Sequence, residues 1–214
     1  PNILKELLEA RANTRKEQKK EPKGIFRWNI LEGKQLAFKT TGNSLYGVIG
    51  ADVSPLCLKD IASCTTATGR AQIMFTKNYI EKNYPGSEIV YGDTDSVFIK
   101  FDNRNKDGTK MEGIESVFES MKKAKESASL ISKQLKPPQN LEFEKCIFPF
   151  VLISKKRYHG HYYTSFTNDY YVNSMGIVLK RRDNANIVKY VFGGMIDIIM
   201  KKNSIPLAID FIKT

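Results

Sequence analysis

The sequence predicts an α+β protein in which helices come first and short strands follow. Apolar residues recur at helical spacing in the first part of the chain, and short apolar runs around turns come later. The regular strand–helix alternation of a parallel sheet is absent, which favours this class over α/β. The 214 residues, 41% of them hydrophobic, are enough for one or two compact units with real cores.

Three helices are expected at the start of the chain. Ile3, Leu4, Leu7 and Leu8 recur at helical spacing and predict an amphipathic helix with a basic side, ending near residues 21–24. A second helix is expected over residues 29–46, closing at Gly47, and a third over residues 59–82. Because the loop between the first two is short, they are predicted to form an antiparallel hairpin.

Strands are expected after the third helix, where short apolar runs around turns replace the helical spacing of apolar residues. The stretch SEIVYGDTDSVFIKF predicts two strands, over residues 88–91 and 96–101, joined by a Gly-Asp-Thr-Asp turn. A helix is expected over residues 112–135, further strands over residues 140–166 with LEFEK on one of them, and a helix over residues 186–200.

The bulk numbers exclude several classes of protein. Thirty-four Lys and Arg against twenty-three Asp and Glu give a net charge of +11, for which a polyanionic partner and plain solubility are equally good explanations. The three cysteines contain no Cys-x-x-Cys pair, which argues against a disulfide framework or a zinc site and suits a reducing compartment. No apolar run reaches the roughly eighteen residues of a membrane span, and no signal peptide is visible.

Two carboxylates stand close together at the predicted strand turn. Asp93 and Asp95 flank Thr94, and their repulsion costs energy unless water, a cation or a hydrogen-bond donor offsets it. Residues i and i+2 of a strand project to the same side, and paired carboxylates suit Mg²⁺. Glu142 and Glu144 also have a period of two. For both pairs a solvated surface remains the alternative.

Basic residues gather in two further patterns. Lys155, Lys156, Arg157 and Tyr158 are consecutive, so on a strand at least one cation could meet a phosphate. On the predicted hairpin, one helical face carries Lys39, Asn43 and Tyr46 and another carries Arg11 and Arg15. If the hairpin is antiparallel, both faces could line one polyphosphate cleft. Solvated basic surfaces are the alternative.

Taken in order, these motifs resemble the family B DNA polymerases. The resemblance extends through LLEAR, KTTGNSLYG, YGDTDSVF, LEFEK, SKKRYHG and MGIVLKRRDN, and so covers nearly the whole chain. It is strongest to the delta-type branch of eukaryotes and large DNA viruses. It implies a fingers helical hairpin over residues 1–47, a palm with a mixed or antiparallel sheet over residues 48–176, and the start of a helical thumb over residues 177–214.

The resemblance also implies roles for individual residues. Asp95 and Asp93 would be catalytic and would ligate Mg²⁺ with Glu144 nearby, Glu142 being a weaker candidate. Two shared dications would then explain why the aspartates tolerate each other. The incoming triphosphate would meet Arg11, Arg15, Lys39, Asn43 and Tyr46, although the family usually has Lys where Arg15 stands. The primer end would be held by Lys155, Lys156, Arg157 and Tyr158. Arg181, Arg182 and Asp183 resemble the palm–thumb junction.

The implied activity is template-directed addition of deoxynucleoside triphosphates to a primer 3′ end by two-metal phosphoryl transfer. The family's other metal-binding aspartate, in an Asp-x-x-Ser-Leu-Tyr-Pro-Ser segment, has no match here and is expected upstream of Pro1. The 214 residues alone are therefore predicted to be inactive. The implied partners are primer–template DNA, deoxynucleoside triphosphates and, in the parent protein, a sliding clamp, with no membrane, at an intracellular replication site.

Other classes of protein remain as alternatives. The first is a catalytically inactive, nucleic-acid-binding relative, which loss of Asp95, Lys39 or Asn43 would have favoured. Reverse transcriptases and RNA-dependent polymerases typically have adjacent aspartates, whereas Thr94 separates them here. A sugar-nucleotide transferase with an Asp-x-Asp metal site would not need the basic helices.

Overall fold

The computed structural model describes residues 2–213 and divides into two compact units, which meet at residues 71 and 72. The division falls inside the helix α3 (Lys59–Asn83). The expected subdomain boundaries at residues 47/48 and 176/177 therefore do not coincide with the division and stay predictions.

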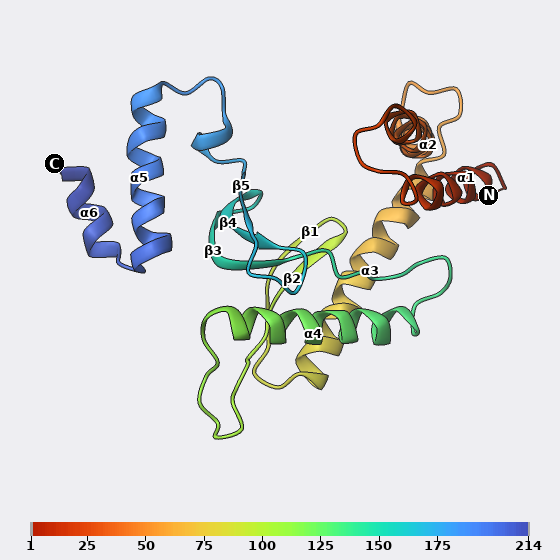
Figure 1. The fold of residues 1–214 in the computed structure, drawn as a ribbon. Helices are drawn as coiled ribbons and strands as arrows, with labels where there is room; N and C mark the ends of the chain where they lie inside the picture. The colour runs from red at the N-terminus through yellow and green to blue at the C-terminus, as the bar shows by residue number, and fades with distance from the viewer. Residues whose placement is uncertain (1, 214) are drawn as a thin grey trace. The chain divides into compact units, whose positions relative to one another are not determined.

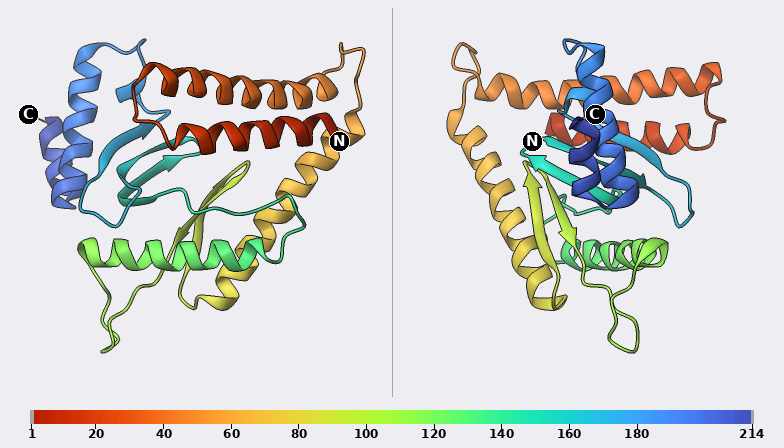
Figure 2. Two further views of the ribbon diagram at one scale, coloured as in Figure 1. Left: turned by 45° about the vertical axis from the view of Figure 1, so that its right-hand side comes forward. Right: turned by 90° about the vertical axis from the view of Figure 1, so that its left-hand side faces the viewer.

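The first unit is built on a hairpin of two helices, α1 (Asn2–Gln18) and α2 (Phe26–Gly50). The helices lie side by side and run in opposite directions (Figure 2). The contacts agree, because the start of α1 meets the later part of α2: a Cβ on Gly42 would lie 3.9 Å from Leu4. Near the other end of α1, Gln18 donates to Glu32. The predicted antiparallel hairpin is confirmed.

The interface between α1 and α2 is unusually polar. Its buried side chains include Thr14, Gln18 and Gln35, with Leu31 as the buried aliphatic residue. The polar groups are satisfied inside the hairpin, since Gln18 Nε2 donates to Glu32 Oε2 at 2.5 Å and Gln35 Nε2 donates to Glu32 Oε1 at 3.0 Å. Pairing of this kind offsets the cost of burying amides.

Helix α2 is longer than predicted and does not end at Gly47. A glycine usually ends a helix by taking a left-handed conformation. Gly47 has no positive φ, and the helix continues to Gly50 before Ala51 turns extended, with φ −84° and ψ 128°.

The second unit holds two small antiparallel sheets and the remaining helices. One sheet is a two-stranded hairpin, and the other has three strands in the order β3-β4-β5. This is the α+β class that the sequence predicts (Figure 1). The elements are β1 (Glu88–Asp93), β2 (Ser96–Lys100), α4 (Gly113–Ser132), β3 (Cys146–Ser154), β4 (Arg157–Tyr163), β5 (Tyr171–Met175), the 3-10 turn η1 (Val178–Lys180), α5 (Asn186–Lys202) and α6 (Ile205–Lys213).

Two apolar clusters attach helices to the three-stranded sheet. Helix α4 packs Val117 and Met121 against Tyr163 at the end of β4. Helix α5 packs Ile196 and Met200 against Ile177, just after β5, and Val151 of β3 packs against the same cluster. Both helices bury one face only, as expected for amphipathic helices on a sheet.

A third cluster is aromatic and joins the two sheets. Tyr91 and Phe98 are a cross-strand pair of the β1–β2 hairpin, with ring centroids 5.2 Å apart. Phe98 also meets Phe150 of β3 at 5.7 Å and Tyr158 of β4 at 5.4 Å. The cluster therefore holds the tip region of one hairpin against the other.

The segment LEFEK is not a strand, contrary to the sequence-based expectation. Residues 141–145 precede β3, and their backbone is tied to the end of α4 instead of to a neighbouring strand. Ser132 Oγ accepts a hydrogen bond from Leu141 N–H at 2.8 Å and donates to the Leu141 carbonyl at 2.9 Å. Residues 141–145 do alternate between half-buried and exposed side chains, as a strand would, but no neighbouring strand of the described chain pairs with them.

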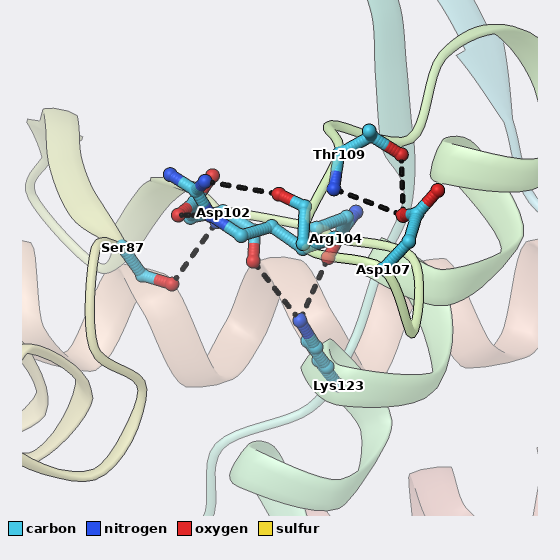
Figure 3. A network of polar contacts seen from close by, with 8 residues as sticks. Ser87, Asp102, Arg104, Asp107, Thr109 and Lys123 are labelled. Carbon is cyan, nitrogen blue, oxygen red and sulfur yellow. Dashed lines mark hydrogen bonds and ion pairs between the residues drawn. The ribbon is translucent and has the colours of Figure 1, made fainter.

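The loop over residues 102–110, which links β2 to α4, is internally hydrogen-bonded (Figure 3). Asp107 Oδ1 accepts from the Thr109 backbone and hydroxyl. Lys123 of α4 donates to the Asp102 carbonyl at 3.3 Å and to Asn103 Oδ1 at 2.9 Å.

Among residues 2–213, no helix is both long and apolar enough to cross a membrane.

Candidate functional site

The turn between β1 and β2 presents the two aspartates, as predicted. Asp93 ends β1, Thr94 and Asp95 form the turn, and Ser96 starts β2. Thr94 has a φ of +55°, and the Asp95 N–H donates to the Asp93 carbonyl at 2.6 Å. Ser96 Oγ donates to the same carbonyl at 3.2 Å, which further fixes the tip.

The carboxylate of Asp93 has a protein counter-ion. Lys156 Nζ lies 2.6 Å from Asp93 Oδ1 and 2.7 Å from Oδ2, and Thr94 Oγ1 donates to Oδ1 at 3.1 Å. The hydrogen bond from Lys156 is the main reason that the pKa of Asp93 lies below its ordinary value, and the same bond raises the pKa of Lys156. The negative charge of Asp93 is thus offset by this chain itself.

The carboxylate of Asp95 is in a different state. It is exposed, and within residues 2–213 its side chain has no hydrogen bond or ion pair to protein. Of the two aspartates at the tip, Asp95 is therefore the one whose oxygens remain available to a ligand.

The basic stretch SKKRY forms a turn and not a continuous strand, which corrects the sequence-based expectation. Lys155 and Lys156 make the turn between β3 and β4, and Arg157 begins β4. Both lysines and Arg157 are exposed, so they lie together at a hairpin end instead of alternating between sheet faces. Tyr158 is half-buried in the aromatic cluster, and burial raises the pKa of its hydroxyl.

The glutamates of LEFEK are exposed, and each is paired with a near neighbour in sequence. Glu142 accepts from Asn140, and Glu144 Oε1 pairs with Lys145 Nζ at 3.0 Å. In the part of the chain that the structure describes, no three His, Cys, Asp or Glu side chains gather closely enough to bind a metal ion. Asp93, Asp95 and Glu144 are therefore not assembled into a three-residue site, and the role of Glu144 stays a prediction.

The polar residues of the helical hairpin lie in rows, as their spacing predicts. Lys39, Asn43 and Tyr46 are exposed on α2. Arg11 of α1 is half-buried and donates from Nε to Gln35 Oε1 at 3.3 Å. Because Gln35 and Lys39 are one helical turn apart, this bond places Arg11 near the start of the Lys39 row.

Arg15 lies away from the Lys39 row. In an antiparallel pair, the step from Arg11 to Arg15 and the step from Gln35 to Lys39 go in opposite directions. Each step is about 6 Å along the axis, so Arg15 and Lys39 are separated by roughly 12 Å along the hairpin. The sequence could not show this, because helical periodicity defines a face and not the register between two helices.

A shallow pocket of about 420 Å³ lies beside Tyr46 in the first unit. Its wall is made almost entirely of small residues from the end of α2 and the start of α3: Gly47, Gly50, Ala51, Ala62, Ser63 and Thr66. The pocket leaves free space next to an exposed aromatic ring.

After η1, Arg181 is paired with its near neighbour Asp183. The Nη2–Oδ2 distance is 2.7 Å, and this ion pair lowers the pKa of Asp183. Arg182 is exposed.

One residue at the tip was missed by the sequence analysis. The Tyr91 hydroxyl lies between Asp93 and the backbone of Lys156, at 3.3 Å from Asp93 Oδ2 and 2.9 Å from the Lys156 nitrogen. Tyr91 is two residues before Asp93, so strand periodicity alone would have placed both side chains on one face.

Comparison with known proteins identifies the family of the chain. The whole chain, residues 1–214, matches the sequence model of DNA polymerase family B. The chain belongs to this family. Among its relatives is a DNA polymerase of Pyramimonas orientalis virus, 49% identical over 184 residues, covering 86% of this chain and 15% of the relative. The DNA polymerase delta catalytic subunit of Candida albicans is 38% identical over 220 residues, covering 100% of this chain and 20% of the relative.

A solved structure supports the fold. The family B DNA polymerase of the hyperthermophilic archaeon Pyrobaculum calidifontis matches 99% of this chain with a TM-score of 0.62 and 25% identity. The chain covers 24% of that structure and between 15% and 20% of the two relatives above, so it spans about a fifth of the length of the proteins it matches.

Proposed function

We propose that these 214 residues are part of a template-directed DNA polymerase that adds deoxynucleoside triphosphates to a primer 3′ end. The single observation that carries the proposal is the junction of two turns: the turn bearing Asp93 and Asp95 meets the turn bearing Lys155 and Lys156, through the Asp93–Lys156 ion pair. A reaction that joins an anionic strand to an anionic nucleotide needs two kinds of group in one place. Carboxylates bind the metal ions, and basic side chains bind the phosphates. Family membership supports the same function.

On this proposal the exposed cations of the β3–β4 turn bind the primer. Lys155, Lys156 and Arg157 present positive charge at one hairpin end, suited to backbone phosphates, and Tyr158 lies next to them at the edge of the aromatic cluster. The hairpin of α1 and α2 binds the incoming nucleotide through Arg11, Lys39 and Asn43. Tyr46 flanks the nascent base pair, and Arg15 makes at most an outlying contact.

Mg²⁺ fits the carboxylate tip in part. Asp95 offers exposed, unpaired oxygens, which are the hard ligands that Mg²⁺ takes, and Asp93 is a second ligand once Lys156 releases it. When bound, the metal would neutralise charge on the phosphoryl oxygens. Glu144 is proposed only as a nearby carboxylate, because in the described part of the chain it does not form a three-residue metal site with Asp93 and Asp95.

The wider partners are also proposals. Primer–template DNA and deoxynucleoside triphosphates are expected as substrates, and a sliding clamp as a processivity partner, at a viral or nuclear replication site. Because the chain covers about a fifth of its relatives, we expect polymerisation from a protein of their length that contains residues 1–214, called here the full-length polymerase, and not from the 214 residues alone.

Asp95→Asn in the full-length polymerase tests the function. The change keeps the shape of the side chain and removes its negative charge, so nucleotide addition should be abolished while primer–template binding persists. Asp169→Asn, at an exposed aspartate between β4 and β5, is the matched control and should be active. Single-turnover primer extension measures both. Retention by Asp95→Asn of more than about a tenth of the wild-type rate, a barrier change below about 1.4 kcal/mol, would contradict the proposal.

A further inference from the structure

We propose that Tyr91 is a positioning residue, whose hydroxyl fixes the Lys156 turn beside the Asp93 tip. Tyr91 touches neither DNA nor nucleotide on this view. It acts through the backbone of Lys156, and thereby sets where the basic turn stands relative to the aspartates. The inference rests on the proposed function, because it assigns a consequence for DNA binding.

The hydrogen-bonding capacity of the hydroxyl fits a bridging role. The Lys156 N–H can only donate, so the Tyr91 oxygen accepts from it at 2.9 Å. The Asp93 carboxylate can only accept when ionised, and the hydroxyl proton points to Oδ2 at 3.3 Å. One oxygen atom thus joins two turns that are 65 residues apart in sequence.

The backbone of Lys156 needs outside support. Its φ of +60° is a left-handed conformation that costs a residue with a side chain roughly 1–2 kcal/mol. In the β3–β4 hairpin the last paired residues are Ser154 and Arg157, so the Lys156 N–H lies outside the ladder and Tyr91 supplies its partner.

A second contact holds the same residue from its other side. The carbonyl of Lys156 lies so close to Gly176 that a Cβ built there would overlap the carbonyl oxygen. Lys156 is therefore held at its N–H by Tyr91, at its carbonyl by the packing of Gly176, and at its side chain by Asp93. Strained conformations persist where the surroundings over-determine them, and they concentrate at functional sites.

The ring of Tyr91 is held independently of its hydroxyl. It packs on Phe98 with centroids 5.2 Å apart and on Tyr158 at 6.2 Å. Tyr91→Phe would therefore keep the aromatic cluster and delete only the bridge. This makes the proposal testable without unfolding the protein.

The expected consequence is a turn that departs from its productive position. Without the hydroxyl, the Lys156 N–H loses its partner and the left-handed turn loses one of its three restraints. Misplacement of binding groups by about 1 Å is enough to slow a positioned reaction substantially. Binding of the primer end and the rate of addition should fall together, while nucleotide affinity should not change.

The first experiment tests the bridge itself by hydrogen-exchange mass spectrometry of the full-length polymerase, on peptides that span residues 153–159. Tyr91→Phe should speed exchange in this segment by about threefold to tenfold, the usual loss for one hydrogen bond. Tyr84→Phe is the matched control, because Tyr84 is also half-buried against a ring, that of Phe101, and has no bond to the turn. Unchanged exchange in Tyr91→Phe would overturn the bridge.

The second experiment measures function in the same variants. Tyr91→Phe should raise the primer–template Kd and lower the single-turnover rate by about threefold to tenfold each, with an unchanged nucleotide Kd and with Tyr84→Phe like wild type. A merely stabilising hydroxyl would lower the melting temperature and leave the constants of the folded enzyme as they are, which would overturn the proposal.

Asp95→Asn distinguishes a failure of the proposed function from a failure of the positioning role of Tyr91. If it abolishes addition while Tyr91→Phe leaves the primer–template Kd unchanged, the positioning role fails and the proposed function stands. If Asp95→Asn is active, the proposed function fails, and the positioning role falls with it.

Discussion

The carboxylate tip of β1 and β2 and the polar face of α2 hold their side chains in different ways. At the tip, Asp93, Lys156 and Tyr91 meet through hydrogen bonds between residues more than sixty positions apart. On α2, Lys39 and Asn43 are exposed and placed by the helix alone. The tip is thus a tertiary construction, whereas the helix face is a consequence of local periodicity. We expect changes at the tip to be strongly coupled and changes on the helix to act independently.

The largest expected effect is at Gly176, which packs against the carbonyl of Lys156. Gly176→Ala should lower the free energy of unfolding by roughly 2–4 kcal/mol, because its Cβ would overlap the Lys156 carbonyl and φ is +60°. Gly113 has a φ of +62° with nothing within 4 Å of an added Cβ, so Gly113→Ala isolates the conformational cost and should lose about 1–2 kcal/mol. Urea unfolding of both variants measures the difference. Equal losses would show that the tip tolerates displacement and is not tightly coupled.

The next effect tests the helix face. Lys39→Ala in the full-length polymerase should raise the nucleotide Kd and slow addition together, because the lysine is proposed to contact charge that grows in the transition state. A charge-assisted contact contributes about 1.5–3 kcal/mol, so roughly a tenfold to hundredfold loss is expected.

Lys34→Ala is the control for Lys39, since it removes an exposed lysine from another side of α2. It should leave nucleotide kinetics unchanged. Single-turnover incorporation across a nucleotide titration measures both variants. A Lys39→Ala defect confined to primer–template affinity would place that lysine on a DNA-binding or solvated face instead.

The smallest effect concerns titration at the tip. The Lys156 hydrogen bond lowers the pKa of Asp93 in the folded state, so the stability from this pair is present above the ordinary aspartate pKa of about 3.9 and is lost as pH falls through the folded value. Lys156→Ala should therefore move the Asp93 pKa upward, toward its ordinary value. Carboxyl NMR titration of the metal-free protein measures it. An unmoved pKa would mean that the ion pair does not persist in solution.

Much of the fold follows from local sequence. Helical periodicity and the Pro22/Gly24 loop predict the α1–α2 hairpin, and the Gly-Asp-Thr-Asp turn predicts the β1–β2 hairpin. The ends of elements do not follow from local sequence alone, since α2 continues past Gly47 to Gly50. A glycine stops a helix only when the following chain turns away, and this depends on the packing beyond it.

The sequence by itself determined the family, through the order of its motifs, and helical spacing placed Lys39 and Asn43 on one face of α2. The chemical roles of these residues, and of Asp93 and Asp95, stay predictions. The tertiary structure alone decided which groups meet. It paired Asp93 with Lys156, inserted the Tyr91 hydroxyl between them, and placed Arg11 rather than Arg15 at the start of the Lys39 row. It also left Asp93, Asp95 and Glu144 unassembled as a three-residue site in the described part of the chain. The physical reason is range: periodicity fixes the direction of a side chain on its own element, whereas the register and approach of distant elements depend on packing between them.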